Sequence, residues 1–304
     1  MYLGIDGGGT STTARVTDSR GRVRGRGAAG PSNPVKVGLP AAKREILAAA
    51  RQALADVPRS QIRAVCVGLA GADRTQVSRP ILNWLPRAIP AQAHLLTTDA
   101  AIALEAALGT RPGVVVIAGT GSIACGRDHQ GRILRVGGWG SVFGDEGSAF
   151  DLGRRGIGAA LRALDGVGPH TRLAGDICTS LELAEVSEVV GLSLKPSQIA
   201  ALARLVIEAS GRGDGPARRI VDGAGRELAR LAAALIRRLG LRQQSVAVVL
   251  AGGLLLSSEV LRRSLRLHLG RLAPEARVTV LGRDPVEGAL AMARRAGRAA
   301  PTLL

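Results

Sequence analysis

Short apolar segments that end in glycine or hydroxyl residues alternate along this chain with longer amphipathic segments. The first apolar segment is 2–6, and two alternating segments follow at 12–17 and 22–28, separated by turn residues at 18–21. This pattern predicts an antiparallel meander of three strands. Residues 62–70 are almost continuously apolar, which is typical of a strand covered by helices on both faces. The pattern therefore predicts an α/β protein.

The same order of elements begins again after a break at 109–113. A strand at 114–118 leads into the turn 119–122, and segments 123–126 and 132–136 predict a second hairpin. The sequence IAGTGSIA at this turn resembles IDGGGTST at the start of the chain, which indicates a weak internal duplication. Further helices are expected at 40–57, 77–85, 100–108, 259–269 and 286–298 and in several segments up to about 240, and further strands at 94–97, 246–250 and 277–281.

The composition limits the class of protein. Hydrophobic residues make up 46% of the 304 residues but aromatic residues only 2%, so the core has to be built from aliphatic side chains. No uninterrupted apolar run reaches the ~18 residues of a membrane span, and the chain begins with a strand rather than a signal peptide. Three scattered cysteines, Cys66, Cys125 and Cys178, predict no disulfide framework, so we expect a cytoplasmic protein.

The net charge of +17 suggests nucleic-acid binding as one possible function. However, the basic residues are spread over the polar faces of helices, and almost no aromatic side chains are available for stacking on bases. We therefore expect no nucleic-acid partner and no membrane partner. Part of the charge would instead attract anionic nucleotides.

The first thirteen residues, MYLGIDGGGTSTT, carry a possible phosphate site. Three glycines, Gly7, Gly8 and Gly9, would let backbone N–H groups approach an anion closely, and Thr10 adds a hydroxyl donor. Asp6 stands where a carboxylate could hold Mg²⁺ through water. On its own the segment also fits a glycine-rich hairpin turn. It contains no lysine, so phosphate charge would be met by Mg²⁺ and backbone donors.

Asp99 follows the expected strand at 94–97 and opens a helix. Ligands of open α/β sheets bind at the carboxyl ends of strands, which favours a general base that takes a proton from an attacking hydroxyl. The alternative is an N-cap residue, because aspartate is among the best helix caps.

The segment 137–148, GGWGSVFGDEGS, combines dense glycine with Trp139 and two adjacent acids, Asp145 and Glu146. The tryptophan is either a packing residue on a surface loop or a wall for a sugar ring. The acids either cap the helix that begins near Ser148 or bind substrate hydroxyls. The cost of five glycines around a bulky aromatic side chain favours a binding site.

Two further segments are candidates for binding. Asn33 in GPSNP is either a turn residue or an amide that holds a hydroxyl. Gly252 and Gly253 follow an apolar strand and permit close approach of a ribose or adenine, although a strand-to-helix turn would use them equally. The four histidines are scattered and form no metal-ligand cluster with the cysteines.

The motifs IDGGGTST, TTDAA, VVVIAGTGS, GGWG…GDEGSAF, VVLAGG and PVEGALAMA occur in this order over essentially the whole chain. Together they resemble the N-acetylglucosamine kinases, within the BadF/BadG/BcrA/BcrD-type ATPase superfamily of actin-like ATPases. The resemblance implies two ribonuclease-H-like α/β lobes around a central cleft for nucleotide and sugar. It implies an N-terminal lobe over 1–108, rejoined by the last helix at 286–304, and a larger nucleotide-binding lobe over 109–285.

The resemblance also implies roles for individual residues. Asp99 would be the base that activates the sugar 6-hydroxyl, and Asp6 would lie near Mg²⁺. The implied nucleotide contacts are Gly7, Gly8, Gly9, Thr10, Thr120, Gly121, Gly213, Gly252 and Gly253. The implied sugar contacts are Asn33, Asp99, Ser122, Gly138, Trp139, Gly140 and Asp145.

The resemblance therefore implies an ATP-dependent kinase, a homodimer, that phosphorylates N-acetylglucosamine at its 6-hydroxyl. One residue departs from the pattern, because animal N-acetylglucosamine kinases carry an asparagine where this chain has Ile123. Isoleucine cannot donate a hydrogen bond, so glucosamine, N-acetylmuramic acid and neutral hexoses stay open as substrates. Two alternatives are disfavoured. A sugar sensor without turnover would not need Asp99. An ATP-driven activator of a 2-hydroxyacyl-CoA dehydratase would need a pattern of cysteines for an iron–sulfur cluster, whereas the three cysteines here are scattered.

Overall fold

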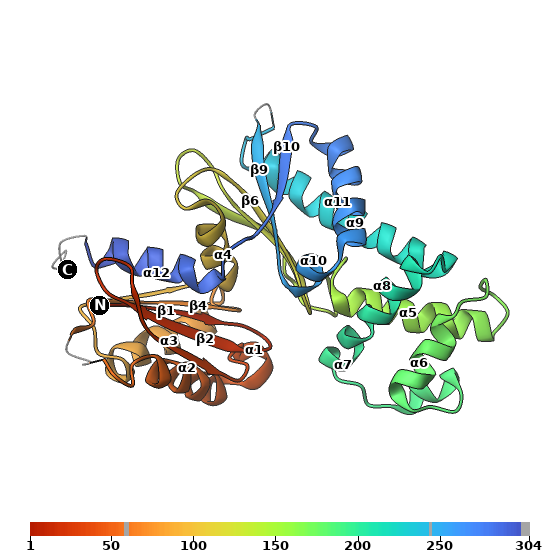
Figure 1. Ribbon diagram of the computed structural model, residues 1–304, viewed down its shortest axis with the longest axis horizontal. Helices are drawn as coiled ribbons and strands as arrows, with labels where there is room; N and C mark the ends of the chain where they lie inside the picture. The colour runs from red at the N-terminus through yellow and green to blue at the C-terminus, as the bar shows by residue number, and fades with distance from the viewer. Residues whose placement is uncertain (58–60, 243–244, 299–304) are drawn as a thin grey trace. The chain divides into compact units, whose positions relative to one another are not determined.

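The computed structural model describes residues 1–57, 61–242 and 245–298, and the chain divides into two compact units. Unit 1 comprises Met1–Arg111 and Leu281–Leu304, and unit 2 comprises Pro112–Val280. The end of the predicted last helix, residues 299–304, lies outside the described residues. Each unit contains its own five-stranded sheet (Figure 1).

The sheet of unit 1 has the strand order β3-β2-β1-β4-β5. The strands β1, β2 and β3 pair antiparallel, which confirms the predicted meander, whereas β4 and β5 run parallel to β1. Its strands are β1 (Tyr2–Gly7), β2 (Thr12–Thr17), β3 (Val23–Ala29), β4 (Ala64–Leu69) and β5 (Ala93–Thr97).

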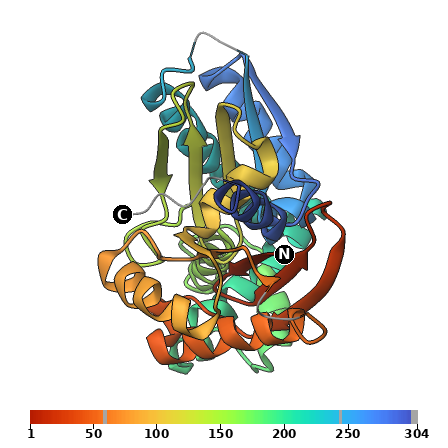
Figure 2. The same ribbon diagram turned by 90° about the vertical axis from the view of Figure 1, so that its left-hand side faces the viewer.

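Helices cover both faces of this sheet, with α2 and α3 on one face and α12 on the other (Figures 1 and 2). Strand β1 alternates accordingly, because Leu3 and Ile5 pack in the cluster with α2 whereas Tyr2 packs with α12. Strand β4 is buried at every position, as its continuous apolar sequence predicts. The helices are α1 (Pro34–Val37), α2 (Leu39–Ala53), α3 (Thr75–Ala88), α4 (Asp99–Leu108) and α12 (Pro285–Ala296).

Two details differ from the sequence-based expectation. Helix α2 ends at Ala53, although the pattern predicts a helix up to Val57. The residue before a proline disfavours the helical region, and Pro58 follows Val57 directly. The short helix α1 was not predicted at all, because its four residues are too few to show a hydrophobic period.

The sheet of unit 2 has the order β10-β9-β6-β7-β8. Strands β6, β7 and β8 pair antiparallel, and β9 and β10 run parallel to β6. This connectivity repeats that of unit 1 strand for strand, so the internal duplication predicted from two short motifs extends over both sheets. The strands are β6 (Gly113–Ala118), β7 (Ser122–Arg127), β8 (Ile133–Gly137), β9 (Val246–Ala251) and β10 (Ala276–Val280).

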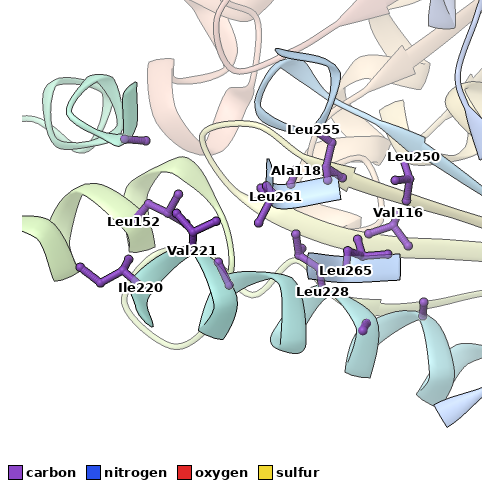
Figure 3. Packing of buried hydrophobic residues seen from close by; sticks show 14 of the residues in the cluster. Val116, Ala118, Leu152, Ile220, Val221, Leu228, Leu250, Leu255, Leu261 and Leu265 are labelled. Atoms are coloured by element: carbon purple, nitrogen blue, oxygen red, sulfur yellow. The ribbon is translucent and has the colours of Figure 1, made fainter. Parts of the chain in front are cut away.

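The core of unit 2 is aliphatic, as the low aromatic content requires, and Figure 3 shows its packing. Val116 of β6, Leu228 of α9 and Leu265 of α11 are fully buried in it. Each such side chain contributes about 1.5–3 kcal/mol by leaving water. No helix among the described residues is long and apolar enough to cross a membrane. The helices of unit 2 are α5 (Ala149–Leu164), α6 (Leu173–Leu181), η2 (Val186–Gly191), α7 (Pro196–Ala201), α8 (Ala203–Gly211), α9 (Gly215–Arg238), α10 (Gly253–Ser257) and α11 (Glu259–Leu272).

Candidate functional site

The carboxyl ends of the parallel strands of unit 1 carry acidic side chains. Asp6 lies near the end of β1, and Asp99 begins α4 two residues after the end of β5. The N-cap of α4 is Thr98, whose hydroxyl accepts a hydrogen bond from the N–H of Ala101 at 3.1 Å. The alternative in which Asp99 is the N-cap is therefore wrong. Its carboxylate accepts a hydrogen bond from Ala100 N–H at 2.9 Å.

Both acids have a raised pKa. Burial raises the pKa of Asp6 to about 7, and the negative charges of Asp99 and Asp284 act in the same direction. Burial also raises the pKa of Asp99, aided by the charge of Asp73 and opposed by the hydrogen bond from Ala100. A carboxylate with a raised pKa is a better proton acceptor near neutral pH, so Asp99 suits a general base.

Asp73 and Asp284 were not singled out from the sequence. Asp73 follows β4 by four residues, and Asp284 is the N-cap of α12. A systematic search for acids just after each parallel strand, which is the rule that identified Asp99, would have found Asp73. Asp284 obeys the same rule, because it follows the parallel strand β10 by four residues. Helix α12 then returns to unit 1.

Residues 8–11, which connect β1 to β2, are called the unit 1 turn. The carbonyl of Gly8 accepts hydrogen bonds from the N–H groups of Ser32 and Asn33, at 3.0 and 3.1 Å. Within the described part of the chain, no acceptor faces the N–H groups of Gly9 and Thr10, and both residues are exposed. The N–H groups of Gly9 and Thr10 are thus available to an anion.

The hydroxyl of Thr12 does not belong to this donor set. It is fully buried and lies 2.7 Å from both the carbonyl of Gly30 and the hydroxyl of Ser32. This contact fixes the segment after β3 against the start of β2. The Thr12 hydroxyl therefore stabilises the structure next to the unit 1 turn, whereas Thr10 is exposed and available to a ligand.

Asn33 is placed beside this turn by α1. Its side-chain oxygen caps α1 by accepting from Val35 N–H at 3.0 Å, which confirms the turn role. In the residues that the structure describes, no hydrogen bond uses the amide nitrogen of Asn33. Two donors are thus left for a ligand hydroxyl, so the two interpretations of Asn33 are compatible.

Asp6 also fits the indirect role expected for a Mg²⁺ site. Among residues 1–57, 61–242 and 245–298, no group of three histidine, cysteine or acidic side chains is arranged to hold a metal ion. Mg²⁺ usually keeps several waters and uses one or two carboxylates together with substrate phosphates. A single carboxylate whose neighbours are Asp99 and Asp284 suits this mode, because a cation would relieve their repulsion.

Residues 119–121, which connect β6 to β7, are called the unit 2 turn. Its carbonyls are occupied, since Gly119 and Thr120 accept hydrogen bonds from the N–H groups of Ala149 and Phe150, at 2.8 and 3.3 Å. Gly252 lies against this turn: a Cβ on it would come within 2.4 Å of the Ala118 carbonyl oxygen. The backbone of Gly253 is also close, 3.9 Å from the Cβ position of Gly119. The structure therefore brings the expected nucleotide residues Thr120, Gly121, Gly252 and Gly253 together.

The acidic pair after the glycine-rich loop folds onto the unit 2 turn. Asp145 has a left-handed backbone (φ 63°), and its carboxylate lies against Gly121, 2.6 Å from where a Cβ would stand. The buried hydroxyl of Ser122 donates to the carbonyl of Glu146 at 2.8 Å. The N-cap of α5 is Ser148, so the alternative in which Asp145 and Glu146 cap this helix is wrong. Strain at a non-glycine residue is typical of functional sites.

The glycine-rich loop places Trp139 at the surface, with 61% of it exposed. The guanidinium of Arg135 lies 4.4 Å from the centre of its ring, which holds the ring by a cation–π contact. Gly138 packs directly over Ile123: a Cβ on it would be 2.7 Å from the Ile123 side chain. Gly140 has a positive φ and open space around it. Trp139 is thus largely exposed, and its contact with a sugar stays a prediction.

Gly213 belongs to other elements of unit 2 than the residues described above. It forms the turn between α8 and α9 with φ +89°, and Asp214 after it caps α9. A Cβ on Gly213 would meet the side chain of Arg218. A turn of this geometry requires glycine by itself, so its contact with a nucleotide stays a prediction.

The cysteines do not fit a cluster that carries electrons. Cys66 and Cys125 are buried, and burial raises the pKa of Cys66 to about 12. Iron–sulfur clusters are held by thiolates, which such an environment disfavours.

Comparison with known proteins identifies the family. The sequence matches the BadF/BadG/BcrA/BcrD ATPase family over residues 3–290. The N-acetylmuramic acid/N-acetylglucosamine kinase of Clostridium acetobutylicum is 33% identical over 299 residues, which is 96% of this chain and 97% of that protein. The N-acetyl-D-glucosamine kinase of Dictyostelium discoideum is 28% identical over 310 residues, with the same coverage of 96% and 97%.

Solved structures show the same fold. A candidate N-acetylglucosamine kinase from Chromobacterium violaceum has a TM-score of 0.76 at 28% identity, over 95% of this chain and 97% of that one. A ROK-family glucokinase from Streptomyces griseus, solved with glucose and AMPPNP, has a TM-score of 0.62 at 18% identity over 97% and 99% of the two chains. These neighbours and the duplicated sheets confirm an α/β fold of two actin-like lobes. Because the family match spans nearly the whole chain, this protein belongs to the BadF/BadG/BcrA/BcrD ATPase family.

Proposed function

We propose that this protein transfers the γ-phosphoryl group of ATP to the 6-hydroxyl of an amino sugar, with N-acetylglucosamine as the first substrate. Sugar kinase activity is common to the curated relatives named above, and this chain is an ATP:sugar phosphotransferase of their kind. The observation that carries the proposal is Asp99, a carboxylate of raised pKa at the carboxyl edge of a sheet whose first turn presents unused N–H donors.

In the proposed reaction, Asp99 accepts the proton of the sugar 6-hydroxyl. The oxygen forms a bond to the γ-phosphorus, the bond between that phosphorus and the β,γ-bridging oxygen breaks, and ADP leaves. Proton transfer to a positioned base contributes about 10²- to 10⁴-fold to the rate. The larger part comes from holding the reacting groups in line and from stabilising the phosphoryl charge.

The unit 1 turn would supply that stabilisation through its backbone. Gly9 and Thr10 are exposed, and no acceptor among the described residues binds their N–H groups. Mg²⁺, when bound, would neutralise phosphate charge, and Asp6 would hold it through water. In unit 2, Thr120, Gly121, Gly252 and Gly253 form a second glycine-rich surface proposed to contact the nucleotide, and Gly213 is proposed to border it.

Sugar binding is proposed for polar groups of each unit. In unit 1, the free amide hydrogens of Asn33 would bind a hydroxyl beside Asp99. In unit 2, Asp145, Gly138, Trp139 and Gly140 would form the contacts and the wall. Ser122 already donates its hydrogen to Glu146, so it would act toward the sugar only as an acceptor.

A coupled assay of ADP release over a panel of sugars tests the proposal. The panel contains N-acetylglucosamine, N-acetylmuramic acid, glucosamine and glucose. We expect sugar-dependent release with the highest kcat/KM for N-acetylglucosamine. Release that is independent of every sugar would contradict the kinase proposal, and a preference for another sugar of the panel would correct the substrate only.

The residue Ile123 provides a second, finer test of specificity. Its side chain lies beneath Gly138 and cannot bond to an acetamido group. In the variant I123N, we expect kcat/KM for N-acetylglucosamine to rise relative to glucosamine. An unchanged ratio would show that acetamido recognition lies elsewhere.

We further propose that the enzyme is a cytoplasmic homodimer that uses Mg²⁺. The buried thiols Cys66 and Cys125 suit a reducing compartment, and the dimer rests on the family resemblance. Light scattering of the purified protein should give twice the mass of the 304-residue chain. A monomer mass at micromolar concentration would contradict the dimer.

A further inference from the structure

We propose that Lys36 is a phosphate-binding residue that places a positive charge over the unit 1 turn. The proposal rests on the proposed function, because the anion would be the terminal phosphates of a nucleoside triphosphate. The sequence of the turn itself contains no cation, and Lys36 lies 27 residues after Gly9.

The side chain of Lys36 extends along the backbone of Gly9. A Cβ on Gly9 would lie 3.3 Å from Lys36 Nζ and 3.8 Å from its Cδ and Cε atoms. The absence of a side chain at Gly9 therefore leaves room for the lysine stem. It also leaves the ammonium beside the N–H groups that have no partner in the described residues.

The position of Lys36 is held by a chain of short-range contacts. The carbonyl of Gly8 accepts from Ser32 and Asn33, and Asn33 caps α1. The backbone N–H of Lys36 donates to the carbonyl of Asn33 at 2.9 Å. Pro34, the first residue of α1, is buried and has a fixed φ. The helix that carries Lys36 is thus attached to the turn that Lys36 covers.

The charge of Lys36 is not used within unit 1. Across the residues that the structure describes, none forms an ion pair with Lys36, whereas Arg15 and Arg22 of the same unit have acidic partners. An unpaired ammonium next to backbone donors is an arrangement that binds phosphate as a point charge.

The use of lysine at this position is itself informative. Of the 41 basic residues, only Lys36, Lys43 and Lys195 are lysine. Arginine presents a rigid planar fork, whereas lysine is a compact charge on a flexible stem. A flexible lysine therefore suits a position from which the charge has to reach over a turn and follow a phosphate during transfer.

Titration calorimetry with ATP, ADP and AMP tests this inference on the full chain. The loss of a hydrogen bond between charged groups should weaken ATP binding to K36M about 10- to 100-fold. AMP should bind as to the wild type, because it lacks the terminal phosphates. K36R, which keeps the charge, should recover part of the ATP affinity.

The matched control is K43M. Lys43 is a second lysine of unit 1, and its ammonium lies 5.7 Å from the ring of Trp84 on another surface. K43M should leave the affinities for ATP, ADP and AMP unchanged. Unchanged ATP binding in K36M, or equal losses for ATP and AMP, would overturn the role of Lys36.

The design separates this inference from the proposed function. A wild-type protein that binds ATP but phosphorylates no sugar would remove the sugar substrate, while the ATP-against-AMP comparison would still decide on Lys36. A wild-type protein that binds neither ATP nor ADP would overturn both.

Discussion

The turns of the two units are built on the same topology but expose different chemistry. In each turn, the carbonyl of the first residue accepts hydrogen bonds from N–H groups at the start of a helix. The donors are Ser32 and Asn33 before α1 for Gly8, and Ala149 at the start of α5 for Gly119. In both turns these bonds occupy the carbonyl at the start of the turn. The duplicated sheets thus share one way of fixing the turn that follows their first strand.

The surroundings of the two turns differ. The unit 1 turn follows the acid Asp6 and is covered by the cation of Lys36. The unit 2 turn follows Ala118 and is packed against the backbone of Gly252 and the carboxylate of Asp145. Charged side chains thus lie at the unit 1 turn, whereas backbone is closely packed at the unit 2 turn. In the proposed function, proton transfer would belong to unit 1 and close approach to the nucleotide would belong to unit 2.

We expect the largest effect on kcat from a substitution of Asp99 in unit 1. D99N removes the proposed base of unit 1 while keeping its shape, and we expect kcat to fall about 10²- to 10⁴-fold. The affinity for ATP should stay near the wild-type value, as measured by calorimetry. Wild-type turnover in D99N would place the chemistry outside unit 1.

The next effect tests the close backbone approach in unit 2. G252A would force a side chain into a conformation reserved for glycine (φ +87°, ψ 146°) and against the Ala118 carbonyl. We expect a loss of about 2–3 kcal/mol in the free energy of unfolding, measured in urea. The adjacent G253A, whose Cβ meets no atom within 4 Å, should lose far less. Equal losses would refute the packing described for this turn.

A smaller effect compares the side chains that support the turns. T12V deletes the buried hydroxyl between Gly30 and Ser32, and should cost about 1–3 kcal/mol. S122A deletes the single bond to the Glu146 carbonyl, and should cost about 1 kcal/mol. Chemical denaturation of both variants measures the difference. A larger cost for S122A would reverse the order that we assign to the two supports.

A further comparison concerns pH. The pKa of Asp6 is raised to about 7 from 3.8, so between these values the native state holds a proton that the unfolded state releases. The free energy of unfolding should therefore fall as pH rises through this window, and D6N should remove that part of the slope. Urea midpoints at several pH values measure it.

Asp18 provides a control of opposite sign. Burial acts to raise the pKa of Asp18, but the hydrogen bonds and charge of Arg22, together with a hydrogen bond from Arg24, outweigh it and lower this pKa to about 2. Its contribution is present above the ordinary pKa and is lost as pH falls toward 2, so D18N should leave the slope near neutral pH unchanged. A neutral-pH slope that D6N leaves intact would contradict the raised pKa of Asp6.

The sequence predicts most of the fold because its signals are local. The apolar run at 62–70 and the alternation at 12–17 specify β4 and β2 within one or two residues. The shared turn motifs reveal the duplication. Asp99 is found because the ends of parallel strands are recognisable from the pattern.

The parts that sequence reasoning missed depend on contacts between distant segments. Lys36 reaches Gly9 only because a four-residue helix, too short for any periodicity, is attached to the unit 1 turn. Asp284 approaches Asp6 only because α12 packs back on β1. Thr12 belongs to a run of four hydroxyls, and only its burial separates it from Thr10.

The most direct test is to identify the product by NMR after incubation with ATP and N-acetylglucosamine. We expect a phosphorus signal coupled to the C6 protons of the sugar in the product of the wild type and of D18N, and no such product from D99N. Asp18 is a suitable control because its turn lies at the opposite end of β2 from the unit 1 turn. Sugar 6-phosphate formed by D99N at the wild-type rate, or only inorganic phosphate from the wild type, would contradict the account.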